Sequence, residues 1–220
     1  MFEAMQRRIV SFLLRIGFGV VVGLALLWVM FVPSFGRCGC RLNAKESAAI
    51  ATLKNVHSGQ GQFRDTATVD SDHDGHGEFG WFGELAGSSP LRGGDVLLQP
   101  FLSPAFGKGN AGRVLRAGYL YQIWLPAKGG GWVTEGDVRE VDGKAAEVTF
   151  RCLAWPLEGK GKRAFFVDAK GTLYACSNSD FRYQGHERPL PVEAAVPTTE
   201  PLLAHTGSQT VGPGDWYPVQ

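Results

Sequence analysis

The first part of the chain is almost continuously apolar. Residues 16–32 contain no charged side chain, and the apolar run reaches back to Ile9 with a single charge at Arg15. A helix needs about 20 residues to cross the hydrocarbon core of a bilayer, and a proline such as Pro33 ends a helix. The pattern therefore predicts a transmembrane helix over residues 9–32.

The charges around this segment predict its orientation. Three arginines lie before residue 16 and two follow at positions 37 and 41, and positive charge is retained preferentially on the cytoplasmic side. We expect a single-pass protein of the inner (cytoplasmic) membrane, in contact with membrane lipid, with its C-terminal head in the periplasm or outside the cell. A cleaved signal peptide is the alternative, because residues 34–36 place small side chains at positions −3 and −1 of a cleavage site.

A helical period follows the membrane segment. Asn43 to Glu46 has the form of a capping box, with Asn43 as the N-cap and Glu46 reaching back to it. Apolar residues then recur at helical spacing between positions 47 and 63, namely at Ala49, Ile50, Leu53, Val56 and Phe63. The pattern predicts an amphipathic helix whose apolar side packs on a sheet.

Further along, apolar and polar residues alternate with the period of two that is typical of strands. The alternating segments are 119–125, 147–154, 163–167 and 172–176. Residues 168–171 separate the last two as a hairpin turn in which Gly171 can take a positive φ. This order predicts an α+β fold, with the amphipathic helix packed on an antiparallel meander sheet of about four strands.

The predicted elements divide the chain into five parts. They are a cytoplasmic N-terminus (1–8), the transmembrane helix (9–32), a juxtamembrane linker (33–42), an α+β head (43–182) and a Pro-rich tail (183–220). The tail is expected to be extended, because it holds six prolines and little periodicity.

Composition and motifs exclude several classes of function. The net charge is +1, and the head holds sixteen basic and sixteen acidic residues, so the attraction that nucleic acid binding requires is missing and no nucleic acid partner is expected. The sequence contains no Gly-x-Ser-x-Gly elbow, no His-Glu-x-x-His motif and no P-loop. We therefore expect no catalytic residues and no enzyme activity.

Four cysteines form two pairs along the chain. Cys152 and Cys176 both lie in predicted strands of one meander, so a disulfide between them is predicted, with two buried free thiols as the alternative. Cys38 and Cys40 directly follow the membrane segment and could link two subunits. Neither pair has the spacing of a zinc site.

Residues 43–56 read Asn-Ala-Lys-Glu-Ser-Ala-Ala-Ile-Ala-Thr-Leu-Lys-Asn-Val. This run resembles the helix that follows the membrane segment in type IV pilin-like and type II secretion pseudopilin-like proteins. Residues 116–119 (Arg-Ala-Gly-Tyr), 154–156 (Ala-Trp-Pro) and 162–168 are similar to later pieces of the same group, in the same order. The resemblance implies a small membrane-tethered head with a helix on an antiparallel sheet, and a structural or assembly role. It also implies contacts with copies of itself or with other pilin-like subunits, and a link to protein secretion.

The prepilin processing motif of that group is not present. Processed members carry Gly, then usually Phe, with Glu at the fifth mature position, whereas Gly17 and Phe18 are followed by Val22 at that place. We interpret the chain as a pilin-like head on an unprocessed anchor.

An acidic run is the sharpest local pattern. Asp70, Asp72 and Asp74 alternate at positions 1, 3 and 5 of a calcium-type loop, His76 can offer its carbonyl at position 7, and Glu78 stands at position 9. Position 12 holds a tryptophan in place of the bidentate glutamate. The run predicts a partial Ca²⁺ site. A solvated turn is one alternative, and a transition-metal site that uses the two histidines of the run is another.

Two aromatic residues, Trp81 and Phe82, follow the acidic run and are predicted to form a binding surface. The leading functional hypothesis is a non-catalytic, membrane-anchored pilin-like envelope protein that acts in assembly or protein contacts. The other is a calcium-dependent envelope module that recognises a glycan or a protein through the acidic run.

Overall fold

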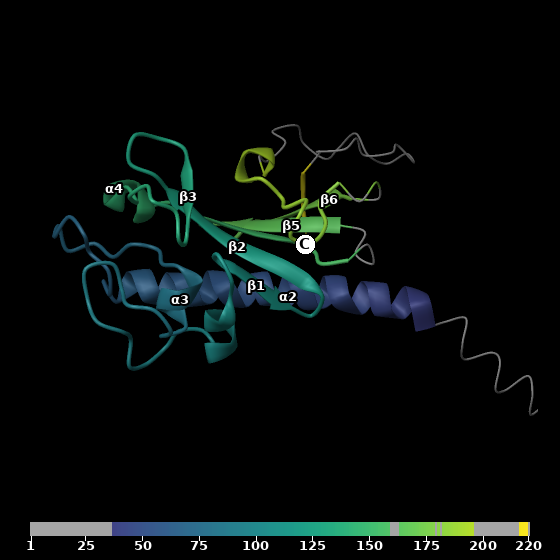
Figure 1. Ribbon diagram of the computed structural model, residues 1–220, viewed down its shortest axis with the longest axis horizontal. Helices are drawn as coiled ribbons and strands as arrows, with labels where there is room; N and C mark the ends of the chain where they lie inside the picture. Colours follow the sequence, from purple (N-terminus) through teal and green to yellow (C-terminus); the bar gives the residue numbers. More distant parts are fainter. Residues whose placement is uncertain (1–36, 159–162, 179, 181, 196–215, 220) are drawn as a thin grey trace, which may run out of the picture. The chain divides into compact units, whose positions relative to one another are not determined.

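The computed structural model describes residues 37–158, 163–178, 180, 182–195 and 216–219, with side chains from Ala44 onward. From Ala44 on, the chain forms one compact unit, drawn in Figure 1. A long helix and an antiparallel sheet make up most of its described part. Short helical turns connect them, namely α3 (Phe82–Leu85), η1 (Pro104–Lys108), α4 (Gly143–Ala146) and η2 (Val192–Ala194).

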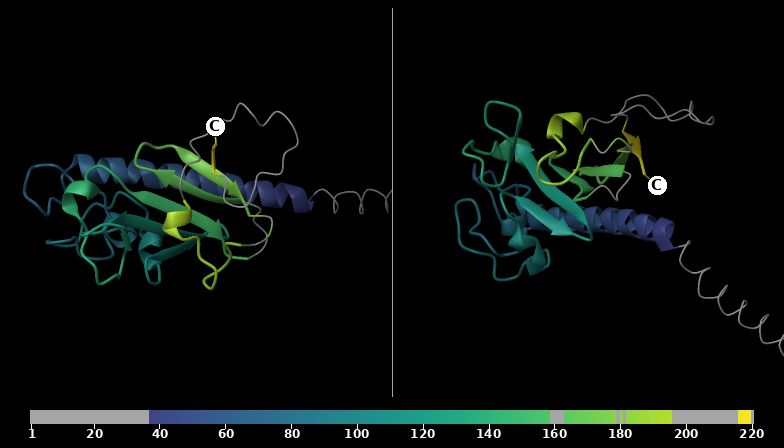
Figure 2. Two further views of the ribbon diagram at one scale, coloured as in Figure 1. Left: turned by 90° about the horizontal axis from the view of Figure 1, so that it is seen from above. Right: turned by 45° about the vertical axis from the view of Figure 1, so that its right-hand side comes forward.

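Helix α2 (Arg37–Asp65) contains the segment predicted to be an amphipathic helix. Ala49, Leu53, Val56 and Phe63 are fully buried, and Ile50 packs against the same core. The helical period of the sequence therefore identified the face of α2 that packs on the sheet (Figure 2).

The start of α2 differs from the prediction. The helix already begins at Arg37, so Asn43 lies inside it and is not its N-cap. Glu46, expected to reach back to Asn43, instead accepts two hydrogen bonds from the guanidinium of Arg163, at 2.9 and 2.7 Å. This charge-assisted pair ties α2 to the sheet, because Arg163 begins strand β5.

The described sheet has seven antiparallel strands, so the prediction of about four is wrong. They are β1 (Arg113–Arg116), β2 (Tyr119–Pro126), β3 (Trp132–Thr134), β4 (Arg151–Pro156), β5 (Arg163–Asp168), β6 (Leu173–Ser177) and β7 (Tyr217–Pro218). The order is β1-β2-β4-β5-β6-β7, and β3 also pairs with β2. The additional strands β1, β3 and β7 have two to four residues, too few to produce a visible alternation.

Turn chemistry sets the register of two hairpins. Ala117 and Gly118 join β1 to β2 with φ of 49° and 82°, the left-handed values that a two-residue hairpin turn requires. The predicted turn over residues 168–171 joins β5 to β6, and Gly171 has φ of 80°. Residues 147–150 were expected to continue a strand but lie outside β4, which begins at Arg151 after α4.

The two faces of the sheet bury separate apolar clusters. On the α2 side, Tyr121 of β2, Cys152 of β4 and Phe165 of β5 pack with the helix. On the opposite side, Trp155 of β4 and Phe166 of β5 belong to the second cluster. Alternation along each strand sends consecutive side chains to opposite clusters, as the pleat of a strand requires.

The C-terminal part of the chain covers the second face. Leu190, Val192 and Trp216 are at most 1% exposed in the second cluster, and Trp155 donates through Nε1 to the carbonyl of Gly185 at 2.8 Å. The expectation of an extended tail over residues 183–220 is therefore wrong for its described residues. They pack because the second face would otherwise leave large aromatic side chains in water.

None of the helices in the described part of the chain combines the length and the apolar character that crossing a bilayer requires. Helix α2 has 29 residues but carries charged side chains such as Lys45, Glu46 and Lys54. The predicted transmembrane helix, residues 9–32, lies outside the described residues. This finding contradicts two expectations. One is a fold that includes a transmembrane helix, and the other is a single-pass location in the inner membrane.

Candidate functional site

The acidic run forms a tight exposed loop between α2 and α3. Asp70 accepts hydrogen bonds from the backbone N–H groups of Asp74 at 3.2 Å and Gly75 at 2.9 Å. His73 and Gly75 take positive φ values of 60° and 87°. The left-handed residues let the chain turn sharply enough for the first carboxylate to hold the other end of the loop.

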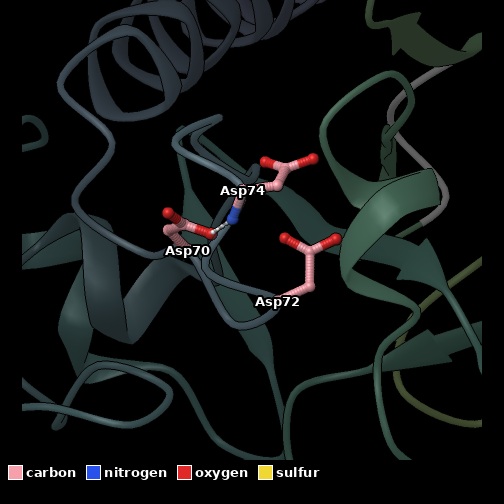
Figure 3. Close-up of side chains that lie close together, drawn as sticks. All are labelled: Asp70, Asp72 and Asp74. Atoms are coloured by element: carbon pink, nitrogen blue, oxygen red, sulfur yellow. Dashed lines mark hydrogen bonds between the residues drawn. The ribbon is translucent and has the colours of Figure 1, made fainter.

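Three of the five predicted metal ligands come together in this loop (Figure 3). Each of Asp70, Asp72 and Asp74 can offer a carboxylate oxygen such that these atoms all lie within 4.8 Å of one another. Asp72 and Asp74 are exposed, and Asp70 is half-buried. Asp72 makes no hydrogen bond within the described part of the chain, so its carboxylate is the most available of the three.

A lysine from α4 already balances part of this charge. Lys144 Nζ lies 2.9 Å from Asp74 Oδ2. The hydrogen bond from Lys144, with that from the His76 N–H, lowers the pKa of the Asp74 carboxyl below its usual range. A cation entering the loop would therefore compete with Lys144 for Asp74.

The other two predicted ligands do not join the cluster. Glu78 is 1% exposed, and its carboxylate accepts from the Ser71 N–H at 2.8 Å and from Arg92 at 2.9 Å. His76 is exposed and lines a hollow of about 370 Å³ beside the end of α2, together with Arg64 and Glu147. The loop therefore presents three carboxylates and not the five-residue set that the spacing predicted.

Arg92 forms a buried charge cluster that the sequence did not predict. Its guanidinium bonds to Glu78 at 2.9 Å and to Glu84 at 3.1 Å, and it donates to the carbonyl of Phe79. Glu84 also accepts from the Trp81 N–H at 2.7 Å. A sequence signal did exist, since two glutamates stand among aromatic residues, and a carboxylate buried with them needs a partner.

Trp81 and Phe82 do not form a binding surface, which corrects the prediction. They are 9% and 1% exposed, and the Phe82 ring stacks on Phe106 with centroids 5.5 Å apart. Buried Gln60 of α2 holds the preceding Gly80 by its N–H at 2.9 Å and its carbonyl at 2.7 Å. These two hydrogen bonds fix the aromatic segment against α2, so its rings enter the core.

Cys152 and Cys176 are buried free thiols, so the predicted disulfide does not form. Their side chains belong to the two clusters on opposite faces of the sheet, and a disulfide needs Cβ atoms about 4 Å apart that point toward each other. Burial raises the pKa of the Cys176 thiol to about 12 and that of Cys152 still further. Thiols with such pKa values are not nucleophilic near neutral pH.

The described geometry thus contains an exposed carboxylate loop that could receive a cation and a buried charge cluster that anchors it. Comparison of the chain with known protein families, with characterised proteins and with solved structures found no match.

Proposed function

We propose that this chain is a non-catalytic pilin-like protein that acts in assembly, and that the solvent face of α2 is its contact surface. The partner is a second copy of the chain or another pilin-like subunit. Two observations support the proposal. One is the resemblance of residues 43–56 to pilin-like proteins, and the other is a structural feature of α2, the helix that contains them.

The observation is the neutral character of the exposed face of α2. Between Ala44 and Gln62, before the Arg64–Asp65 pair that ends the helix, the exposed positions carry one charge, at Lys54. The others are Ala44, Ser47, Ala51, Asn55, Ser58 and Gln62. A helix that faces only water usually carries several charged residues on that side.

Small neutral side chains favour burial against a partner. Ala loses no rotamer entropy on burial and Ser loses little, and neither leaves an unpaired charge in an interface. Short side chains also let two helices approach closely. Both faces of the sheet bury large apolar clusters against the chain's own residues. In the described part of the chain, the outer side of α2 therefore remains as an extended, regular surface for a partner.

Photo-crosslinking in cells tests this proposal. A photoreactive residue placed at Ser47 or Ala51 of the full chain should give adducts with a second copy or with a pilin-like subunit, identified by mass spectrometry. The matched control is the same residue at Val138, a loop position that is 97% exposed. Equal yields from the three positions, or adducts from Val138 alone, would contradict the proposal.

A calcium-dependent binding module is the second candidate function, favoured by the convergence of Asp70, Asp72 and Asp74. The loop would bind Ca²⁺ through carboxylate oxygens, the ligands that this ion prefers, and would then recognise a glycan or a protein. Calorimetric titration of the full chain with CaCl₂ should give binding that Asp72→Asn abolishes. Asp72 is the informative position because, unlike Asp70, it holds no backbone group of the loop.

The control variant for this titration is Asp95→Asn, an exposed aspartate outside the loop. Unchanged binding in Asp95→Asn together with loss in Asp72→Asn would support the calcium function. A titration without binding would leave the loop as a solvated turn.

A further inference from the structure

A small pocket on the side of the molecule that carries α3 has no role in either function proposed above. It encloses about 260 Å³ between the turn that follows α3, the segment around η1 and the ends of β1 and β3. Five glycines form much of its wall, and Ser88, Ser89, Phe106, Val114 and Glu135 supply its main side chains. Glu135 is the single ionisable residue in this lining.

Glycines at positions 83 and 107 leave room for three side-chain oxygen atoms in the wall of this pocket. A Cβ atom on Gly83 would overlap Oε1 of Glu135 and Oγ of Ser89. Ser88 Oγ donates to the carbonyl of Gly83 at 3.3 Å, and a Cβ on Gly107 would overlap that same Oγ. Glycine at position 83 therefore leaves room for the Glu135 and Ser89 oxygens, and glycine at position 107 leaves room for that of Ser88.

The carboxylate of half-buried Glu135 has no cationic partner in the described part of the chain. Its hydrogen bond in the described structure is a long one, from the Gly83 N–H to Oε2 at 3.4 Å, and Oε1 has no partner in the described part of the chain. Burial raises the pKa of Glu135, the charge of Glu84 raises it further, and the Gly83 N–H offsets part of the shift. No cation contributes to that balance.

The neighbouring charges cannot supply the missing cation. Glu84 and Glu78 already share the guanidinium of Arg92, at 3.1 and 2.9 Å. Arg116 lies with its guanidinium carbon 4.4 Å from the centroid of the Phe106 ring, where it makes a cation–π contact and no ion pair with Glu135 within the described structure. Arg92, whose side chain is 20% exposed, thus pairs with Glu78 and Glu84, and the pocket lies beside Glu135, which has no such ion pair in the described part of the chain.

We propose that this pocket binds a primary ammonium group on an alkyl chain. Oε1 of Glu135 is its counter-ion, the hydroxyl oxygens of Ser88 and Ser89 accept its other two hydrogen bonds, and Phe106 and Val114 contact the carbon chain. The ammonium comes either from a free alkylamine or from a lysine side chain of a partner protein.

The donor set favours an ammonium over other cations. An ammonium has three donors on a compact charge, which matches one free carboxylate oxygen and two hydroxyls. A guanidinium would need both carboxylate oxygens for a bidentate pair, and Oε2 already accepts from Gly83. Ca²⁺ takes six to eight oxygen ligands. The pocket, at about 260 Å³, is also smaller than sites for drug-sized ligands, which start near about 300 Å³.

Calorimetric titration of the full chain at pH 7 tests the proposal, with n-butylammonium chloride as the probe and n-butanol as its uncharged counterpart. We expect n-butylammonium to bind and n-butanol to bind at least about tenfold more weakly, because a charge-assisted hydrogen bond contributes roughly that factor. Glu135→Gln should lose at least about tenfold in amine affinity for the same reason.

The matched control is Glu140→Gln. Glu140 lies in the same connection between β3 and α4, but its side chain is 74% exposed and pairs with Lys128. Carbon-13 NMR of the Glu135 carboxyl gives a second readout, since a bound ammonium must lower the pKa of this group whereas a purely structural carboxyl would not respond. Equal binding by n-butanol, unchanged affinity in Glu135→Gln, or no binding at about 50 mM amine would overturn the proposal.

A second probe distinguishes the two sources. Nα-acetyl-lysine methylamide carries the same ammonium on a peptide unit. Tighter binding of this probe than of n-butylammonium assigns the site to a lysine of a partner protein. Equal affinity assigns it to a free alkylamine, and both results support an ammonium site.

Discussion

Two groups of carboxylates lie close together along the chain but have opposite environments. Asp72 and Asp74 are exposed, and Asp74 pairs with Lys144. Glu78 and Glu84 follow within ten residues, yet both are 1% exposed and bind Arg92. The difference shows that sequence spacing identified the exposed group and missed the buried one, which ties Glu78 and Glu84 to Arg92.

Removing Arg92 should have the largest effect on this comparison. Arg92→Met keeps most of the side-chain volume but leaves Glu78 and Glu84 buried without a cation. Loss of one partner from a buried ion pair costs about 3–5 kcal/mol. We expect the free energy of unfolding, measured by urea titration of the full chain, to fall by about 3 kcal/mol.

The control for that variant is Arg139→Met, because Arg139 pairs with Asp137 on the surface. Exposed pairs contribute little, so its urea midpoint should match that of the unmodified protein. Equal midpoints in the two variants would mean that the Arg92 cluster does not stabilise the segment from Glu78 to Arg92.

Glu135 should show a smaller, pH-dependent effect. Burial raises its pKa in the folded protein above the usual 4.5, so the folded state binds protons more readily than the unfolded chain. The resulting stability is present below the unfolded pKa and is lost as the pH rises through the folded pKa. Glu135→Gln should therefore unfold at a higher temperature than the unmodified protein at pH 7, with the difference vanishing near about pH 4.

Calorimetric scans between these two pH values measure this difference. A constant difference in unfolding temperature between the two proteins across this range would show that the pKa of Glu135 is the same in the folded and the unfolded chain.

The smallest effect is expected at Lys144. Its pair with Asp74 is exposed, so Lys144→Met should leave the urea midpoint unchanged. If the loop binds Ca²⁺, removal of this competing cation should increase the affinity for Ca²⁺ by about threefold, measured by the same titration. A weaker affinity would mean that Lys144 supports the loop and does not compete with the ion.

Periodic segments were predictable from the sequence. The helical spacing of Leu53, Val56 and Phe63 identified the buried face of α2, because one amphipathic helix needs no distant information. The turn at Gly171 was predictable for the same reason, since its positive φ is a local requirement.

Features set by distant partners were not predictable. Leu190, Val192 and Trp216 cover the second face as isolated apolar residues in an aperiodic segment, so no pattern marked them. Glu78 does not join the three aspartates because its two carboxylate oxygens accept from Ser71 and from Arg92, which lies fourteen residues later. The aromatic residues Trp81 and Phe82 are buried because Gln60 of α2 holds the backbone beside them.

The central claim is that the neutral solvent face of α2 is a contact surface. Self-association of the chain tests this claim most directly. Sedimentation equilibrium should compare the full chain with a double variant, Ala51→Glu and Ser58→Glu, whose two positions are exposed and whose new residues favour helix. We predict that the unmodified chain associates and that the variant stays folded but associates at least about tenfold more weakly, because like charges would face each other across the contact. Unchanged association of a folded variant would contradict the account.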